Sequence, residues 1–312
     1  MNKKPILITS IIAFITFCSF YKNNDDLIIQ KKNKFNLNDL QNIDYSYNQF
    51  FPDNNFSQFP IMINNLVLSE VELLLKKKGF LQRVFRNSKY YLPTIELKLK
   101  EGGFPQELQF LPVIESGLNN FAVSPAGAVG MWQFTDITAS QYGLTNKYSI
   151  DERKDFVKAT VSACKFLKYL YRTTNDWYLT LAAYNAGPTF LKNILDKSQE
   201  KQFFLLAESG YFKNETVRFI PRFIAMYFIF KYANQLCPEL YRDRKNIIID
   251  SIEIAGYESI AEIIRFSEMS MFEFKMYNAH LTKLLSLKKS IPGSFNLPQD
   301  KKHLINENFL RK

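Results

Sequence analysis

Histidine and cysteine are scarce in this chain of 312 residues. Its two histidines, His280 and His303, lie near the carboxyl terminus, so a histidine-rich metal site is excluded. A Ser-His-Asp triad would have to use one of these two residues. The three cysteines include no CxxC pair for zinc or redox chemistry. We therefore expect neither a metal nor a cofactor.

Glycine is also sparse, and its 11 copies are scattered along the chain. The sequence contains no GxxxxGK[ST] phosphate loop and no GxGxxG after a strand, which excludes the common nucleotide-binding sites. The functions that remain are catalysis by carboxylates and simple ligand binding.

Basic residues exceed acidic ones, with 40 Lys and Arg against 30 Asp and Glu, for a net charge of +10. An anionic partner is therefore plausible, although charge alone does not choose among nucleic acid, membrane and acidic polysaccharide. No basic cluster interleaved with aromatic residues is present, so we expect no nucleic-acid binding. The hydrophobic content of 46% predicts a folded chain with a large core.

The first 20 residues resemble a targeting segment, because Lys3 and Lys4 precede an apolar run. That run is shorter than the roughly 20 residues of a membrane span, which favours a secretory signal or an amino-terminal anchor. Cys18 suggests lipidation, but Phe17 stands where such signals need a small residue, so simple cleavage and an uncleaved anchor stay open. Residues 21–59 are polar and resemble a tether. We therefore expect export to the periplasm or cell envelope, with membrane attachment left open.

Residues 60–240 are expected to form one all-α domain, and residues 241–312 a smaller extension. Gly102-Gly103 should end one helix, and Pro105 suits the first turn of the next. Asn246–Ile254 is the best strand candidate. Cys164 and Cys237 could pair in an oxidising compartment, although a buried thiol is the favoured interpretation of Cys164. Helices are expected at Leu68–Leu75, Tyr91–Lys100, Ile150–Thr173, Trp177–Ala186, Thr189–Leu195 and Glu215–Asn234.

A gap in this helical pattern runs from Ser116 to Thr135, and long loops inside helical domains usually serve function. Glu115 precedes the gap and closes the apolar run Phe110–Ile114. Burial would raise the pKa of its carboxyl and allow general-acid catalysis, although a structurally satisfied buried Glu is the alternative. Ser116 could orient this carboxyl.

Side chains suited to a sugar follow in two further segments. Gln133 could bond an acetamido group, and Trp132 could either stack on a sugar face or pack in the core. Gly130, just before them, would let a ligand approach the backbone. Tyr184 and Asn185 add a phenol and an amide at the end of a helix.

Four segments occur in the order and spacing of the soluble-lytic-transglycosylase (goose-lysozyme-like) family: Glu115-Ser116, Gly130-Met131-Trp132-Gln133-Phe134, Ala183-Tyr184-Asn185-Ala186-Gly187 and Glu215-Thr216. Residues 90–195 most resemble its membrane-bound lytic murein transglycosylase D type. The resemblance implies a lysozyme-like helical domain that cleaves the MurNAc–GlcNAc bond of peptidoglycan glycan strands. It implies that Glu115 is the single catalytic acid and base. The residues expected to bind or orient substrate are Ser116, Ser124, Gly130, Met131, Trp132, Gln133, Tyr184, Asn185 and Glu215.

Two features depart from this family. Phe219 stands where the fourth motif carries a tyrosine, and we expect the extension to lack the carboxy-terminal LysM modules common in the D type. If that phenol normally contacts the catalytic carboxyl, its loss could lower activity. A muramidase that hydrolyses the same bond is one alternative, and a catalytically silent peptidoglycan-binding protein, suggested by Phe219, is another.

Overall fold

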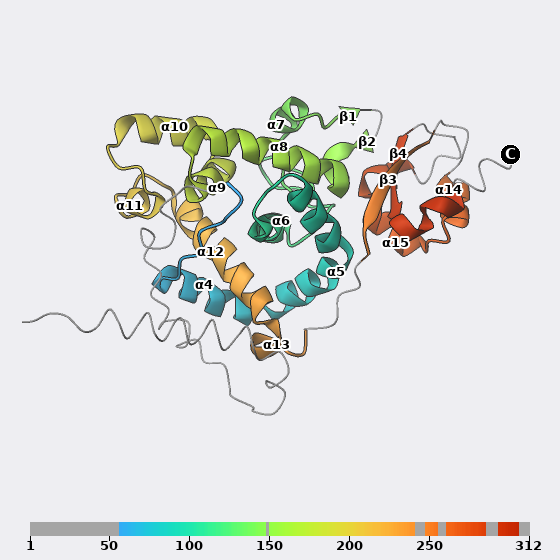
Figure 1. Cartoon of the computed structure of the whole chain (residues 1–312), viewed down its shortest axis with the longest axis horizontal. Helices are drawn as coiled ribbons and strands as arrows, with labels where there is room; N and C mark the ends of the chain where they lie inside the picture. Colours follow the sequence, from blue (N-terminus) through green and yellow to red (C-terminus); the bar gives the residue numbers. More distant parts are fainter. Residues whose placement is uncertain (1–55, 148–149, 241–246, 255–259, 285–292, 306–312) are drawn as a thin grey trace, which may run out of the picture. The chain divides into compact units, whose positions relative to one another are not determined.

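The computed structural model describes residues 56–147, 150–240, 247–254, 260–284 and 293–305. The predicted leader at residues 1–20, its Cys18 and nearly all of the tether lie outside these ranges. The described part is helical apart from two short antiparallel strand pairs, which confirms the predicted all-α class (Figure 1).

The main helices are held together around α12 (Asn214–Lys231), which packs against α4 (Asn65–Lys76), α6 (Leu111–Ser116) and α9 (Trp177–Ala186). α8 (Phe156–Thr174) packs against α9 and α5 (Lys78–Glu101). Fully buried rings such as those of Trp132, Phe156 and Phe223 fill the core between these helices. The remaining elements of this part are η2 (Gln106–Phe110), α7 (Asp136–Gln141), β1 (Asn146–Lys147), β2 (Ile150–Asp151), η3 (Glu152–Lys154), α10 (Pro188–Lys197), α11 (Phe203–Glu208) and α13 (Ala233–Leu236).

Several helix ends follow the expected capping chemistry. α5 ends at Glu101, directly before Gly102-Gly103, and α9 has the predicted bounds. Pro188 occupies the first turn of α10, where a missing N–H costs nothing. Pro105 directly precedes the next helix, as expected, and this helix is the 3₁₀ helix η2.

Two helices begin elsewhere than expected. α5 starts at Lys78, earlier than the expected Tyr91, and continues through Pro93 in its interior. α8 starts at Phe156, later than the expected Ile150, because the Asp155 carboxylate caps the helix by accepting bonds from the N–H groups of Val157 and Lys158.

The carboxy-terminal extension contains the predicted strand as β3 (Ile249–Ile254), paired with β4 (Gly293–Pro298) in antiparallel register (Figure 1). Asn296 of β4 donates from Nδ2 to Asp155 Oδ1 at 2.8 Å, which ties this strand pair to the cap of α8. Both residues are completely buried. Short helices complete this part: α14 (Ile260–Phe266), α15 (Met271–Tyr277), η4 (Ala279–Leu284) and η5 (Gln299–Lys301).

Cys164 and Cys237 are both free thiols, so the disulfide left open by the sequence is not formed in this structure. Burial raises the pKa of Cys164 to about 12 and that of Cys237 to about 11. Both thiols therefore stay protonated and unreactive at neutral pH.

None of the helices that the structure describes is both long enough and apolar enough to cross a bilayer.

Candidate active site

Glu115 lies in the last turn of α6, which ends where Gly117 adopts a left-handed backbone conformation. Its side chain is half-buried and makes no hydrogen bond or ion pair with the residues that the structure describes. Loss of hydration, together with the nearby negative charge of Glu215, raises the pKa of Glu115 to about 8. The carboxyl group is therefore protonated at neutral pH, the state that a general acid needs.

The Ser116 hydroxyl makes no hydrogen bond to this carboxyl among the residues that the structure describes. Its hydroxyl donates to the Met131 carbonyl at 2.9 Å and accepts from the Asn119 N–H at 3.1 Å. The expectation of a direct bond to the Glu115 carboxyl is thus wrong for this structure, because the hydroxyl is used to join α6 to the following loop.

The loop from Gly117 to Thr135 is folded back on itself by small bridges between Val123 and Val129 and between Val129 and Phe134. Ser124 closes one turn of it, because its hydroxyl accepts from the Ala128 N–H at 3.0 Å. The predicted loop is therefore confirmed, and its ordered backbone positions the residues that follow it.

Two predicted contact residues are inside the protein. Met131 and Trp132 are completely buried, and the indole N–H of Trp132 donates to Thr160 Oγ1 at 2.9 Å. A sugar cannot stack on a ring that has no exposed face. The stacking expectation for Trp132 is corrected to core packing, and Met131 contributes its backbone carbonyl to Ser116.

Gly130 is buried as well, with φ of +82°, and the atom that approaches it belongs to the protein. A Cβ atom built there would lie 1.9 Å from the Arg153 carbonyl oxygen. The expectation that Gly130 lets a ligand approach is therefore wrong. The glycine is needed because two backbone segments cross closely at this point.

Arg153 is a residue that the sequence analysis missed. It is buried, and its guanidinium pairs with Asp136 and Asp151, each at 2.9 Å. Its guanidinium also donates to the Gly127 carbonyl of this loop at 3.4 Å, a contact that the mixed charges of the surrounding sequence did not indicate.

Partly exposed polar side chains lie on the loop and on α9. Gln133, with φ of +52°, donates from Nε2 to the Gly130 carbonyl at 2.8 Å. Its amide oxygen accepts no hydrogen bond within the described ranges. On α9, the Tyr184 hydroxyl donates to the Trp132 carbonyl at 2.7 Å. Burial and the charge of Glu115 raise the pKa of Tyr184 well above its ordinary value, which places the phenol in the electrostatic field of this carboxyl.

Asn185, the next residue, accepts at Oδ1 from Thr216 Oγ1 at 2.9 Å. This bond fixes the end of α9 to the first turn of α12, where Glu215 is exposed. Thr216 belongs to a quoted motif, but its partner was not predictable from spacing. Phe219, one turn further along α12, is buried.

Among the residues that the structure describes, no group of three or more His, Cys, Asp or Glu side chains could hold a metal ion.

Comparison with known proteins finds a family domain that contains most of these residues. The family model for the transglycosylase SLT domain matches residues 93–206. Over these residues the chain is similar to the lytic transglycosylase family. The match contains Glu115, Gln133, Tyr184 and Asn185, and it ends before Glu215.

Two curated relatives extend this similarity. Membrane-bound lytic murein transglycosylase D of Escherichia coli K12 is 26% identical over 221 residues, covering 69% of this chain and 48% of that protein. Membrane-bound lytic murein transglycosylase F of Desulfosudis oleivorans is 25% identical over 180 residues, covering 49% of this chain and 39% of that protein. The chain thus spans about half the length of the curated relatives it matches, or less.

The 70 kDa soluble lytic transglycosylase of Escherichia coli is a similar solved structure, with 20% identity and a TM-score of 0.38 over 49% of this chain and 26% of that one.

Proposed function

We propose that this protein is a peptidoglycan lytic transglycosylase that cleaves the β-1,4 bond between MurNAc and GlcNAc and leaves anhydro-muramoyl ends. The observation that carries the proposal is the half-buried Glu115 near the end of α6, which has no ion pair among the described residues and whose pKa is raised to about 8 by burial and by Glu215. The names of the curated relatives, both murein transglycosylases, support the substrate class.

In the first step, Glu115 donates its proton to the glycosidic oxygen as the bond to C1 of MurNAc breaks. The acetamido group of the same sugar stabilises the positive charge that develops at C1. A protonated carboxyl with no basic partner can supply this proton at neutral pH, because no ion pair holds it in the charged form.

In the second step, the Glu115 carboxylate takes the proton of the MurNAc C6 hydroxyl, and the C6 oxygen bonds to C1. The nucleophile belongs to the substrate, so its effective concentration is high and no activated water is needed. A second catalytic carboxylate, which most glycosidases use, is therefore unnecessary.

The other predicted site residues fall into two groups according to their role. Gln133, Tyr184 and Asn185 are half-buried and are proposed to contact substrate, with the open Gln133 amide oxygen accepting an acetamido N–H. Ser116, Ser124, Gly130, Met131 and Trp132 are proposed to orient the loop that carries Gln133.

The presence of Glu215 near Glu115 favours one alternative function, hydrolysis of the same bond by a muramidase. Its charge acts on Glu115, so a second carboxylate stands near the proposed acid and could activate water.

The first prediction concerns the products of murein digestion. Wild-type protein incubated with purified murein should release fragments with anhydro-muramoyl ends, which mass spectrometry distinguishes from reducing ends by the mass of one water. Reducing ends in their place would support the muramidase alternative and refute the transglycosylase.

The second prediction concerns Glu215. Glu215→Gln removes a negative charge that raises the pKa of Glu115, so that pKa should fall. The alkaline limb of the rate profile, expected near pH 8 in the wild type, should move to lower pH. Glu208→Gln removes the same charge from an exposed site on α11 and should leave the limb in place. An unmoved limb in Glu215→Gln would refute the coupling.

Export and attachment complete the proposal. Murein lies outside the cytoplasm, so the leader-like residues 1–20 would carry the protein to the cell envelope and could anchor it to the membrane. The net charge of +10 suits an anionic wall polymer, and no nucleic-acid partner is proposed.

A further inference from the structure

The carboxy-terminal extension contacts the loop from Gly117 to Thr135 through a backbone carbonyl. Asn120 of the loop donates from Nδ2 to the Met276 carbonyl of α15 at 3.2 Å, and the Tyr91 hydroxyl of α5 donates to the same oxygen at 3.0 Å. Asn120 and Tyr91 are each 1% exposed. Both bonds are therefore shielded from water, and one oxygen of the extension joins the loop to α5.

Packing alone does not explain an amide at position 120. The Oδ1 atom of Asn120 is buried and accepts no hydrogen bond from the residues that the structure describes. A leucine has nearly the same shape and would fill this space without burying an unpaired acceptor, which costs free energy. The amide therefore contributes through the bond that its Nδ2 atom makes to Met276.

Asn120 lies one residue from the contact that joins the loop to α6. The N–H of Asn119 donates to the Ser116 hydroxyl at 3.1 Å. Ser116 directly follows Glu115, the proposed acid, in the last turn of α6. A shift of Asn120 would therefore reach the residue beside the proposed acid through a short stretch of backbone.

In the other direction, Asn120 is linked to Gln133. The carbonyl of Ala122, two residues further along, accepts from the Gly130 N–H at 2.9 Å. The Gly130 carbonyl in turn accepts from Gln133 Nε2 at 2.8 Å. Gln133 is the residue proposed to hold the acetamido group of the substrate. The position of its amide thus depends on the loop segment that Asn120 fixes.

The extension also supports this loop at Gly130. Asn296 of β4 donates from Nδ2 to Asp155 Oδ1 at 2.8 Å, and both residues are completely buried. Asp155 directly follows η3, and the Arg153 carbonyl oxygen of η3 closely approaches Gly130. The extension therefore holds the loop at two places, directly at Asn120 and through η3 at Gly130.

From these contacts we infer that the carboxy-terminal extension positions the loop of the active site, and that Asn120 is the positioning residue through which it acts. Asn120 is too deeply buried to touch substrate. It fixes the segment that aligns Gln133 with the acetamido group as charge develops at C1, and a misplacement of about 1 Å can cost an enzyme about 100-fold in rate. The inference rests on the proposed function, which assigns this contact to Gln133.

The test compares two variants that each remove one donor from the Met276 carbonyl. Asn120→Leu removes the donor of the loop at nearly constant shape, and Tyr91→Phe removes the donor of α5. For Asn120→Leu we expect kcat on soluble murein strands to fall about tenfold or more with KM within about twofold, because Tyr184 and Asn185 on α9 still bind substrate. For Tyr91→Phe we expect both constants to stay within about twofold of wild type.

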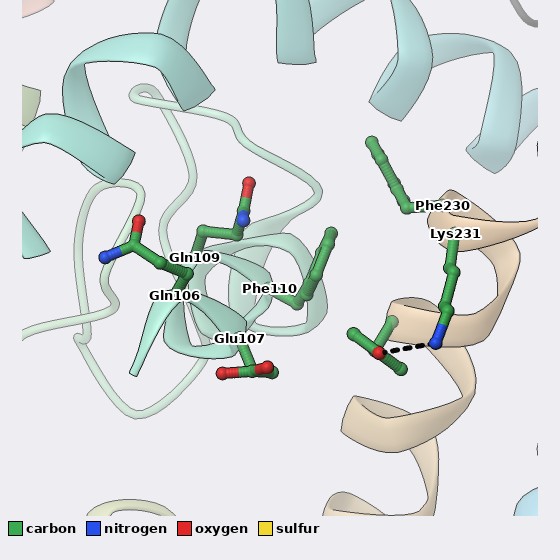
Figure 2. Close-up of a pocket in the computed structure, with 7 residues that line it drawn as sticks. Gln106, Glu107, Gln109, Phe110, Phe230 and Lys231 are labelled. Carbon is green, nitrogen blue, oxygen red and sulfur yellow. Dashed lines mark hydrogen bonds between the residues drawn. The ribbon is translucent and has the colours of Figure 1, made fainter. Parts of the chain in front are cut away.

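Melting temperatures are recorded alongside the rates, because both variants lose a buried hydrogen bond and should be less stable than wild type. The rates are measured at a temperature at which every variant is folded. Tyr227→Phe is a further control, since it removes a hydroxyl that accepts from Lys231 Nζ at 3.1 Å within α12, in the wall of a pocket between η2 and α12 (Figure 2). That bond involves neither the loop nor the extension, so Tyr227→Phe should leave kcat and KM unchanged.

An unchanged kcat in Asn120→Leu would overturn the inference. Equal losses of kcat in Asn120→Leu and Tyr91→Phe would overturn it too, since a contact that only stabilises the fold would affect both variants alike. A rise in KM larger than the fall in kcat would assign Asn120 to substrate binding instead. If Asn120→Leu does not fold, Asn120→Ala, which cannot overpack the site, takes its place in the comparison. Failure of the proposed function is separate, because it is read from reducing ends in the products of the wild-type chain.

Discussion

Glu115→Gln should reduce the release of anhydro-muramoyl products from murein by about 10³-fold or more, because general acid–base catalysis typically contributes 10²–10⁴ and one residue here performs both proton transfers. The glutamine has nearly the same shape, so the chain should fold and still bind murein. Product release measured by chromatography, with murein retention measured by pelleting, separates the two effects. Unchanged product release would exclude Glu115 as the acid. Retained binding with no turnover in the wild type as well would support the catalytically silent alternative.

The same substitution should alter how stability depends on pH. The folded-state pKa of Glu115 is about 8 against an ordinary value of 4.5, so between these values the folded chain holds a proton that the unfolded chain releases. Wild-type stability at this site is therefore complete below about pH 4.5 and is lost as pH rises toward 8. The amide that replaces the carboxyl in the variant cannot ionise and escapes this loss.

We therefore expect the melting temperature of Glu115→Gln, relative to wild type, to rise between about pH 5 and pH 8. Glu208→Gln provides the matched control, since Glu208 is exposed on α11. A difference between Glu115→Gln and wild type that stays constant across this range would contradict the raised pKa.

The helical class and many helix ends could be predicted from local chemistry. Gly102-Gly103 and Gly187-Pro188 end and start helices through backbone constraints that act within a few residues. The start of α5 could not be predicted, since Pro93 in its interior resembles a first-turn signal and tertiary packing overrides it.

The strand β3 was predicted, but its partner β4 was not. The two are separated by more than 30 residues in the sequence and pair only because the extension folds back on itself. The buried contact from Asn296 to Asp155 joins residues 141 positions apart, and no spacing rule anticipates it.

The candidate site, too, could be predicted only in part. Ordered motifs predicted that Glu115, Gln133, Tyr184 and Asn185 belong together. They did not reveal which side chains are exposed, because exposure depends on distant partners such as Thr160, which binds the Trp132 indole. The motif residues therefore include both candidate ligand contacts and residues that only support the loop.

Gly130→Ala should be the most destabilising single substitution among those proposed here. The added methyl group would lie 1.9 Å from the Arg153 carbonyl oxygen, a backbone atom that cannot rotate aside. The site also has φ of +82°, which costs an alanine about 1–2 kcal/mol. Relief of the contact requires the two backbone segments to separate, and overpacking of this kind costs about 1–3 kcal/mol. We expect a total of about 2–5 kcal/mol and a melting temperature lowered by roughly 10 °C.

Gly127→Ala is the matched control, because Gly127 has φ of +79° and nothing within 4 Å of a built Cβ. It should show only the backbone cost of about 1–2 kcal/mol. The difference between the two variants, measured by thermal or urea unfolding, isolates the crossing with Arg153. Equal losses of unfolding free energy in the two variants would show that the backbone crossing leaves room for a methyl group. Because the Gly130 carbonyl accepts from Gln133 Nε2, the fraction of Gly130→Ala that remains folded should also lose murein turnover, whereas folded Gly127→Ala should retain it.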